Sequence, residues 1–148
     1  MASIVEQVRD GVVADFNAAG VAHFGAALTT TVDSKWFDAT DHTTTGLGVH
    51  VIGDGFRSTR LTRKSEGIEV DVIVHVNKKL DGDTIAEVDD LAELVEAFEK
   101  FYFSTAEIST VPATLRSTSV QLPTRKMLNK SRRFYAWARL TFYLVRNH

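Results

Sequence analysis

The side chains best suited to chemistry in this sequence are histidines and acids, because the 148-residue chain has no cysteine. That absence excludes a thiol nucleophile, a thiolate zinc site and structural disulfides. His50 and His75 lie on two predicted strands and become neighbours if those strands pair, with Asp71 or Asp38 available to complete a metal site. No H-x-x-x-H or H-x-H spacing supports such a site. Histidines on the polar faces of strands are the better interpretation, and we expect no metal.

Other catalytic and cofactor signatures are also missing from the sequence. There is no G-x-S-x-G elbow, and the glycine pairs at 46–48 and 53–55 lack the form of a phosphate-binding loop. The segment 38–42 lacks the glycine and the terminal glutamate of a calcium loop. Asp89 and Asp90 fall on the first turns of a predicted helix, where carboxylates favour the helix dipole. We therefore expect neither an enzyme nor a bound cofactor.

Two basic segments are candidates for binding. The first, in the predicted connection between two strands, contains Arg57, Arg60, Arg63 and Lys64, and the second, before the last strand, contains Arg125, Lys126, Lys130, Arg132 and Arg133. Tyr135 and Trp137 follow the second segment, and basic residues interleaved with aromatics can bind nucleic acid. Arginines and aromatics are also enriched in subunit contacts. The isoelectric point near 6.2 argues against a dedicated nucleic-acid binder.

Charge is divided unevenly along the chain. Residues 1–107 hold 9 Lys/Arg and all 19 Asp/Glu, a net charge of −10, while residues 108–148 hold 8 Lys/Arg and no acid, a net charge of +8. The overall net charge of −2 conceals this division. Such asymmetry indicates either nucleic-acid binding or complementary protein surfaces.

The elements that must position these residues follow from capping signals and hydrophobic periodicity. Ser3 and Glu6 form a predicted capping box, and Gly20 is a natural helix stop. The predicted elements are a helix at 4–18, strands at 22–32, 47–52 and 68–77, a helix at 84–103, a short strand at 117–122, a helical turn at 124–130 and a final strand at 134–145. The segments 33–45, 54–67 and 104–116 are predicted loops, and loops of this length tend to be functional.

The predicted fold is an α+β single domain spanning residues 1–148, with two helices covering one face of a mostly antiparallel sheet. A length of 148 residues suits one hydrophobic core, and the 44% hydrophobic and 24% charged content is typical of globular proteins. No window approaches 18 consecutive apolar residues, so no membrane association is expected. The first ten residues lack the pattern of a signal peptide, which makes the cytoplasm the expected compartment.

Several local phrases occur in a recognisable order. The N-terminal helix S-I-V-E-x-V-R-D leads to a Trp-Phe-Asp turn at 36–38 and the strand G-L-G-V-H-V-I. The connection R-S-T-R-L-T-R then runs into V-D-V-I-V-H-V-N-K-K at 70–79. The helix D-D-L-A-E-L-V-E-A-F and the strand F-Y-A-W-A-R-L-T-F-Y-L-V-R at 134–146 complete the chain. Over its whole length this layout resembles small tailed-bacteriophage proteins of the head-to-tail neck, most of all tail terminators. The chain departs from the family in lacking a proline near Asp38.

The resemblance implies a structural protein of the virion, located in the neck and assembled in the host cytoplasm. Tail terminators form hexameric rings that cap the tail tube, end its polymerisation and join the tail to the head connector. The implied partners are further copies of the chain, the tail tube protein and a head-completion connector protein. DNA would pass through the lumen without specific binding, and a lumen of that kind should not be strongly basic.

On this hypothesis the candidate interface residues are both basic segments and their counterparts. The set is Arg57, Arg60, Arg63, Lys64, Arg125, Lys126, Arg132 and Arg133, with Glu93 and Glu96 on the acidic helix and Trp36, Phe37 and Trp137 as apolar anchors. A subunit of a head-to-tail ring uses two different patches, one fitting the other. The alternative is a nucleic-acid-binding domain that uses the basic segments 57–64 and 125–133.

Overall fold

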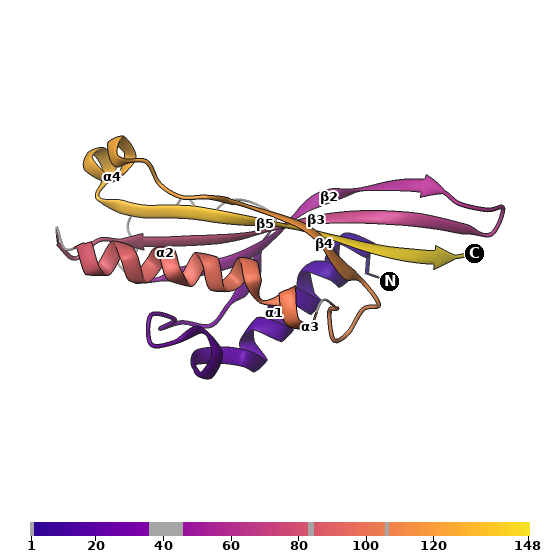
Figure 1. Ribbon diagram of the computed structural model, residues 1–148, viewed down its shortest axis with the longest axis horizontal. Coiled ribbons are helices and arrows are strands. Elements are labelled where there is room, and N and C mark those ends of the chain that lie inside the picture. The colour runs from indigo at the N-terminus through magenta and orange to yellow at the C-terminus, as the bar shows by residue number, and fades with distance from the viewer. Residues whose placement is uncertain (1, 36–45, 83–84, 106) are drawn as a thin grey trace.

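The computed structural model describes residues 2–35, 46–82, 85–105 and 107–148 (Figure 1). Its elements are α1 (Ile4–Phe24), β1 (Asp33–Lys35), β2 (Gly48–Arg60), β3 (Ser65–Lys79), α2 (Ile85–Lys100), α3 (Tyr102–Thr105), β4 (Thr114–Gln121), α4 (Arg125–Ser131) and β5 (Arg133–Asn147). The predicted α+β class is confirmed.

The five strands form one sheet in the order β1-β2-β3-β5-β4. Short β1 runs parallel to β2, and every other neighbouring pair is antiparallel. The sheet is therefore mostly antiparallel, as predicted. Strands β2, β3 and β5 are long, and in Figure 1 they extend to the right beyond the helices.

One face of this sheet carries the hydrophobic core. The alternating residues Val70, Val72 and Val74 of β3 are completely buried on that face. Helix α1 packs over β2 and β3, whereas α2 packs over β5 and β4. The helices contribute side chains at the three- and four-residue spacing of an amphipathic helix, including Val8, Val12, Phe16, Leu91, Leu94, Val95 and Phe98. The prediction that two helices cover one face is confirmed.

Helix α1 begins as the sequence predicts but continues further. The Ser3 hydroxyl accepts a hydrogen bond from the Glu6 amide at 3.2 Å, and the Glu6 carboxylate accepts one from the Ser3 amide at 2.8 Å. This is the predicted capping box. Gly20, with φ of 53°, kinks the helix instead of ending it, and the helix ends at Gly25, whose φ is 87°. Both values lie in the left-handed region that glycine tolerates best.

The predicted strand at 22–32 is wrong. Phe24, Leu28 and Val32 are buried, but Ala26 and Thr30, which a strand would place beside them, are exposed or half-buried. The side chain of Asn17 instead holds the backbone of Val32, binding its amide and its carbonyl at 2.8 Å each. Because a helix side chain satisfies the backbone here, the segment needs no strand partner before β1.

The predicted loop at 54–67 is also wrong, because a hairpin occupies it. Strand β2 continues through Gly53 and Gly55 to Arg60, with a bulge at Asp54 that shifts the register. Gly55 has a φ of 124°, so glycine permits this irregularity. Only residues 61–64 connect β2 to β3, so the basic segment 57–64 belongs to a hydrogen-bonded hairpin.

The remaining elements follow the predictions more closely. Strand β5 and helix α4 agree with the expected ranges, and Thr124 caps α4 by accepting from the Met127 amide at 3.2 Å. Strand β4 begins at Thr114, three residues earlier than predicted. The predicted helix at 84–103 divides into α2 and the short α3. Residues 36–45, which include much of the predicted loop at 33–45, lie outside the described part of the chain.

Candidate interaction surfaces

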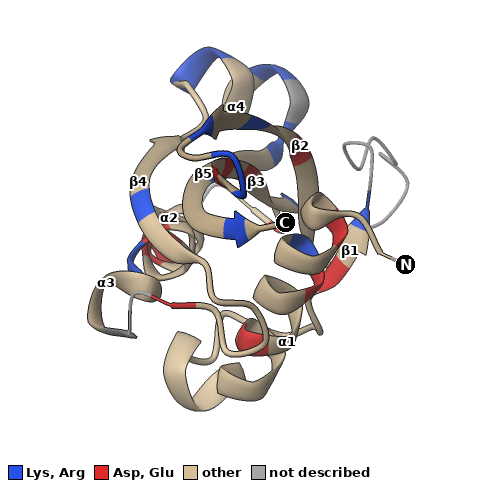
Figure 2. Cartoon of the chain, turned by 90° about the vertical axis from the view of Figure 1, so that its right-hand side faces the viewer, with Lys and Arg blue, Asp and Glu red and all other residues tan. Residues whose placement is uncertain are grey.

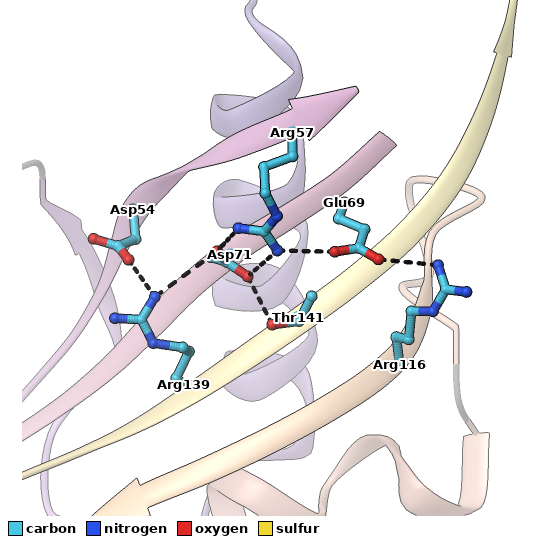
Figure 3. Close-up of polar contacts among 7 residues, drawn as sticks. All are labelled: Asp54, Arg57, Glu69, Asp71, Arg116, Arg139 and Thr141. Atoms are coloured by element: carbon cyan, nitrogen blue, oxygen red, sulfur yellow. Dashed lines mark hydrogen bonds and ion pairs between the residues drawn. The ribbon is translucent and has the colours of Figure 1, made fainter. Parts of the chain in front are cut away.

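The face of the sheet opposite the helices carries a network of ion pairs. The pairing register brings Arg57, Glu69 and Tyr143 into one cross-strand row, and Gly55, Asp71 and Thr141 into the next. The bulge at Asp54 adds a further carboxylate, while Arg116 of β4 and Arg139 of β5 complete the group (Figure 3). Three arginines and three acids therefore share this surface, which we call the open face, and their formal charges cancel.

The network is centred on Asp71, whose side chain is only 9% exposed. Arg57 donates to Asp71 at 2.7 Å and to Glu69 at 2.9 Å, and Thr141 donates to Asp71 at 2.7 Å. Arg139 binds Asp54 and lies 3.8 Å from the Asp71 carboxylate. Arg57 is thus held by acids of its own sheet, although its side chain is 59% exposed.

These contacts shift the pKa values of the central groups. Burial by itself would raise the pKa of Asp71, but hydrogen bonds from Arg57 and Thr141, with the charges of Arg57 and Arg139, hold that pKa below its ordinary value. The hydrogen bonds from Arg57 to Asp71 and Glu69 raise the pKa of the arginine. Both partners therefore stay charged at neutral pH, and the Arg57 guanidinium is bound by carboxylates of its own chain.

At one end of the open face, Tyr143 packs against Gly67 and Arg116. Arg116 donates to Glu69 at 3.1 Å and places its guanidinium carbon 4.6 Å from the centre of the Tyr143 ring. The ring lies over Gly67, where an added Cβ would fall 2.5 Å from the tyrosine hydroxyl oxygen. Glycine at this position leaves room for the aromatic ring against β3, where the ring receives the cation–π contact.

The two strand histidines are neighbours, as the sequence suggested. His50 pairs with His75 across β2 and β3. A ring nitrogen of His50 is within hydrogen-bond distance of the Asp33 carboxylate of β1, and the ring of buried His75 packs edge-on against Tyr135 with the centroids 4.2 Å apart. Within the described residues, no three His, Cys, Asp or Glu side chains are grouped to hold a metal ion. Each histidine therefore contacts a residue on a neighbouring strand, which is a structural role.

Exposed basic side chains gather at two places. Exposed Arg60, Arg63 and Lys64 form the end of the β2–β3 hairpin, which we call the hairpin tip together with Leu61 and Thr62. Exposed Arg125 and Lys126 lie on α4, where Lys and Arg colour much of the helix in Figure 2. None of these five cations forms an ion pair with another described residue.

The other predicted interface residues fall into different environments. Arg132 ends α4 in the left-handed conformation with φ of 54°, while Arg133 is buried and donates to Asn77 at 3.1 Å. Arg133 is therefore a structural residue of this fold. Trp137 is half-buried on the open face, 5.9 Å from the Arg139 guanidinium. Trp36 and Phe37 lie outside the described residues.

The acidic face of α2 is exposed and borders a groove. Asp90, Glu93 and Glu96 are exposed, and none of the three forms an ion pair with a described residue. A groove of about 380 Å³ runs between α2 and the end of α1. Its lining includes buried Phe24 and Leu94, with Asp90 and Glu93 at its margin. We call this the α1–α2 groove.

Sequence reasoning identified Arg57 but missed its partners. Glu69 and Asp71 stand on the polar side of the alternating strand 68–77, and Arg139 and Thr141 stand on the polar side of 134–145. The alternation was readable, but the network depends on which strands are neighbours and in what register. The bulge at Asp54 shifts the register by one residue, and this shift decides which side chains of β2 face those of β3. The residue types alone do not show that pairing.

No protein-family model and no curated protein matches the chain. One solved structure that matches has the description "Virion of native gene transfer agent (GTA) particle", with 15% sequence identity, a TM-score of 0.44, and coverage of 99% of this chain and 96% of that chain. A likeness at this identity and TM-score does not assign a function. The described helices include none with the length and apolarity needed to cross a membrane.

Proposed function

We propose that the chain is a structural subunit of a tailed-bacteriophage neck, a tail-terminator protein that forms a ring on the end of the tail tube. The ring, which we take to be a hexamer, ends tube polymerisation and presents a surface to the head connector. This proposal begins from the resemblance of the whole chain to that family. It requires subunits to bind through two different surfaces, because a closed ring repeats one head-to-tail contact.

The observation that carries the proposal is the separation of exposed charges of opposite sign on the folded chain. Among the described residues, the cations of the hairpin tip have no acidic partner, and Asp90, Glu93 and Glu96 of α2 have no basic partner. Exposed charges of opposite sign guide association and fix its register. Basic α4, with Arg125 and Lys126, is a further contact surface, which we assign to the tail tube or the connector.

The charge balance of the open face fits a structural role near DNA. Arg57, Arg116 and Arg139 are each bound to an acid, so this face offers phosphates few uncommitted cations. A lumen lined by free lysines and arginines would hold DNA through many phosphate contacts. If the open face lines the lumen, its balanced charges let DNA pass.

The function is tested by measuring assembly alone and on tail tubes. Mass photometry of the purified chain should give ring-sized particles, either free or after addition of tail tubes assembled from the tube protein encoded near this chain. Added to polymerising tube protein, the chain should also shorten the tubes. A chain that stays monomeric and neither binds tube ends nor changes tube length would refute the proposal. We also expect neighbouring genes to encode portal, capsid, tube or sheath proteins.

Nucleic-acid binding is the second candidate, favoured by the unpaired cations of the hairpin tip and α4. It predicts DNA affinity that falls steeply with salt and is reduced by Arg60→Ala with Arg63→Ala. Because Arg57 is committed to Asp71 and Glu69, Arg57→Ala should change DNA affinity less than Arg63→Ala. Absence of DNA binding at low salt would remove this candidate.

A further inference from the structure

We infer that the hairpin tip of one subunit inserts into the α1–α2 groove of the next. This inference deepens the proposed function and rests on it, since the contact would build the ring. It commits both surfaces to a second copy of this chain. The supporting observations are the shape and charge of the groove, the matching character of the tip, and their positions in the fold.

The groove combines an apolar floor with an acidic margin. Phe24 and Leu94 are 7% and 1% exposed, and Ala97 is half-buried beside them. Exposed Asp90 and Glu93 stand at the margin and form no ion pair with a described residue. An occupant suited to this site presents a modest apolar side chain flanked by cations.

The hairpin tip has that composition. Leu61 is 50% exposed, although leucine favours burial, and exposed Arg60 and Arg63 stand close to it in the turn, followed by Lys64. The leucine would contact the apolar floor while the cations meet the acids at the margin. Arginines are enriched in protein contact surfaces, and charge complementary to that of the groove margin favours association.

The tip is held in a defined shape before it binds. The amides of Leu61 and Thr62 both donate to the carbonyl of Ser65, at 3.0 and 3.2 Å. The hydroxyls of Thr62 and Ser65 are 2.8 Å apart, and the Lys64 amide donates to the Thr62 hydroxyl at 3.2 Å. A turn ordered in this way loses little conformational freedom on docking, which favours binding.

The two surfaces lie in different parts of the molecule. In Figure 1 the hairpin tip is at the right-hand end of the longest axis, while most of α2 and the end of α1 lie in the left half. The tip therefore reaches a groove only on another copy. A contact between two different patches is heterologous, and its repetition closes a ring or extends a filament.

The test exchanges charge between the two surfaces. The tip variant carries Arg63→Glu and Lys64→Glu, and the groove variant carries Asp90→Lys and Glu93→Lys. Each alone places like charges in contact and should weaken self-association by about tenfold or more. An equimolar mixture should assemble again, because the acidic tip fits the basic groove and the unchanged tip fits the unchanged groove.

A control variant distinguishes this contact from a general effect of net charge. Lys35→Glu with Lys79→Glu reverses two exposed lysines outside both surfaces and changes the net charge as the tip variant does. It should assemble like the unchanged chain. Circular dichroism of every variant should show the unchanged fold, since all the altered side chains are exposed.

Covalent trapping tests the same contact when free self-association is too weak to measure. The chain has no cysteine, so Leu61→Cys in one preparation and Ala97→Cys in another provide the only thiols. Mild oxidation with diamide should join them into a mixed dimer that exceeds both homodimers. Pairing Leu61→Cys with Ser119→Cys, an exposed position on β4, should give far less.

The outcomes separate this inference from the proposed function. Restored assembly in the mixture, or selective trapping of Leu61→Cys with Ala97→Cys, supports the inference. Variants that assemble like the unchanged chain, a mixture that does not assemble, or trapping no greater than that of the Ser119→Cys control would overturn it while leaving ring formation intact. An unchanged chain that neither self-associates nor binds tail tubes would refute the proposed function instead.

Discussion

Neutralising Asp71 should destabilise the fold at neutral pH, because this carboxylate organises the open face. Asp71→Asn keeps the shape of the side chain and an oxygen that can accept from Thr141. It removes the negative charge that Arg57 contacts at 2.7 Å and that Arg139 approaches to 3.8 Å. The substitution thus isolates the charge from the packing.

The expected magnitude follows from burial and from the type of contact. A hydrogen bond to a charged group contributes about 1.5–3 kcal/mol, and the low exposure of Asp71 limits screening by solvent. Because Arg57 is largely exposed and regains water, we expect a loss of about 2 kcal/mol in the free energy of unfolding. For a chain of this length that lowers Tm by about 4–8 °C.

The difference should disappear in acid. The pKa of Asp71 is lowered in the folded state, so its stabilising effect is fully present above the unfolded pKa of about 3.9 and is lost as the pH falls through the folded value. The unchanged chain should therefore lose stability on acidification, while Asp71→Asn loses less. The two unfolding free energies should converge below the folded pKa.

Urea unfolding followed by circular dichroism, at one protein concentration and at several pH values, measures both effects. Glu69→Gln is the matched control, since Glu69 contacts two arginines but its side chain is 35% exposed. It should cost about 0.5 kcal/mol. An Asp71→Asn chain as stable as the unchanged one at pH 7, or a gap that persists undiminished in strong acid, would refute the reasoning.

Three further predictions concern α1 and its contacts. Gly11→Ala should lower the free energy of unfolding in urea by about 1–3 kcal/mol, because the added Cβ would lie 2.6 Å from Ile108. This clash should outweigh the better helix propensity of alanine. An unchanged or raised stability would contradict this packing. Tyr102→Phe removes the 2.7 Å hydrogen bond to Asp15 and should lower the free energy of unfolding by about 1 kcal/mol, whereas a neutral effect would show that the bond adds nothing. Ser3→Ala removes the capping box and should cost about 1 kcal/mol, with Ser3→Asp retaining most of the stability.

Signals within a few residues, such as helix caps and strand alternation, correctly predicted the elements that depend on neighbouring residues. The capping box of α1, the Thr124 cap of α4 and the alternation of β5 each depend on residues within a few positions, and all three are confirmed. The fold class followed from the order of these elements. The strand predicted at 22–32 failed because alternating small residues give a weak signal, while Asn17, distant in sequence, holds the Val32 backbone.

The candidate surfaces also depend partly on residue type and partly on tertiary contacts. Residue type was sufficient to find the basic segments and the acidic helix, since exposed charge in an amphipathic pattern is visible in the sequence. It could not show that Arg57 is bound by Asp71 and Glu69, while Arg60 and Arg63 form no ion pair with a described residue. That difference depends on the pairing of β2 with β3 and on which side of the hairpin each side chain projects.

The sequence by itself determined the α+β class, the helix caps, the long alternating strands and the uneven distribution of charge, because each depends on neighbouring residues. Only the tertiary structure decided which charges are cancelled and which remain available. Strand register is a long-range property, and the bulge at Asp54 shifts it by one residue. The hairpin tip and the acidic groove margin both come from residues 1–107, whose net charge is −10. Residues 108–148, with a net charge of +8, contribute α4 and two arginines of the charge-balanced open face.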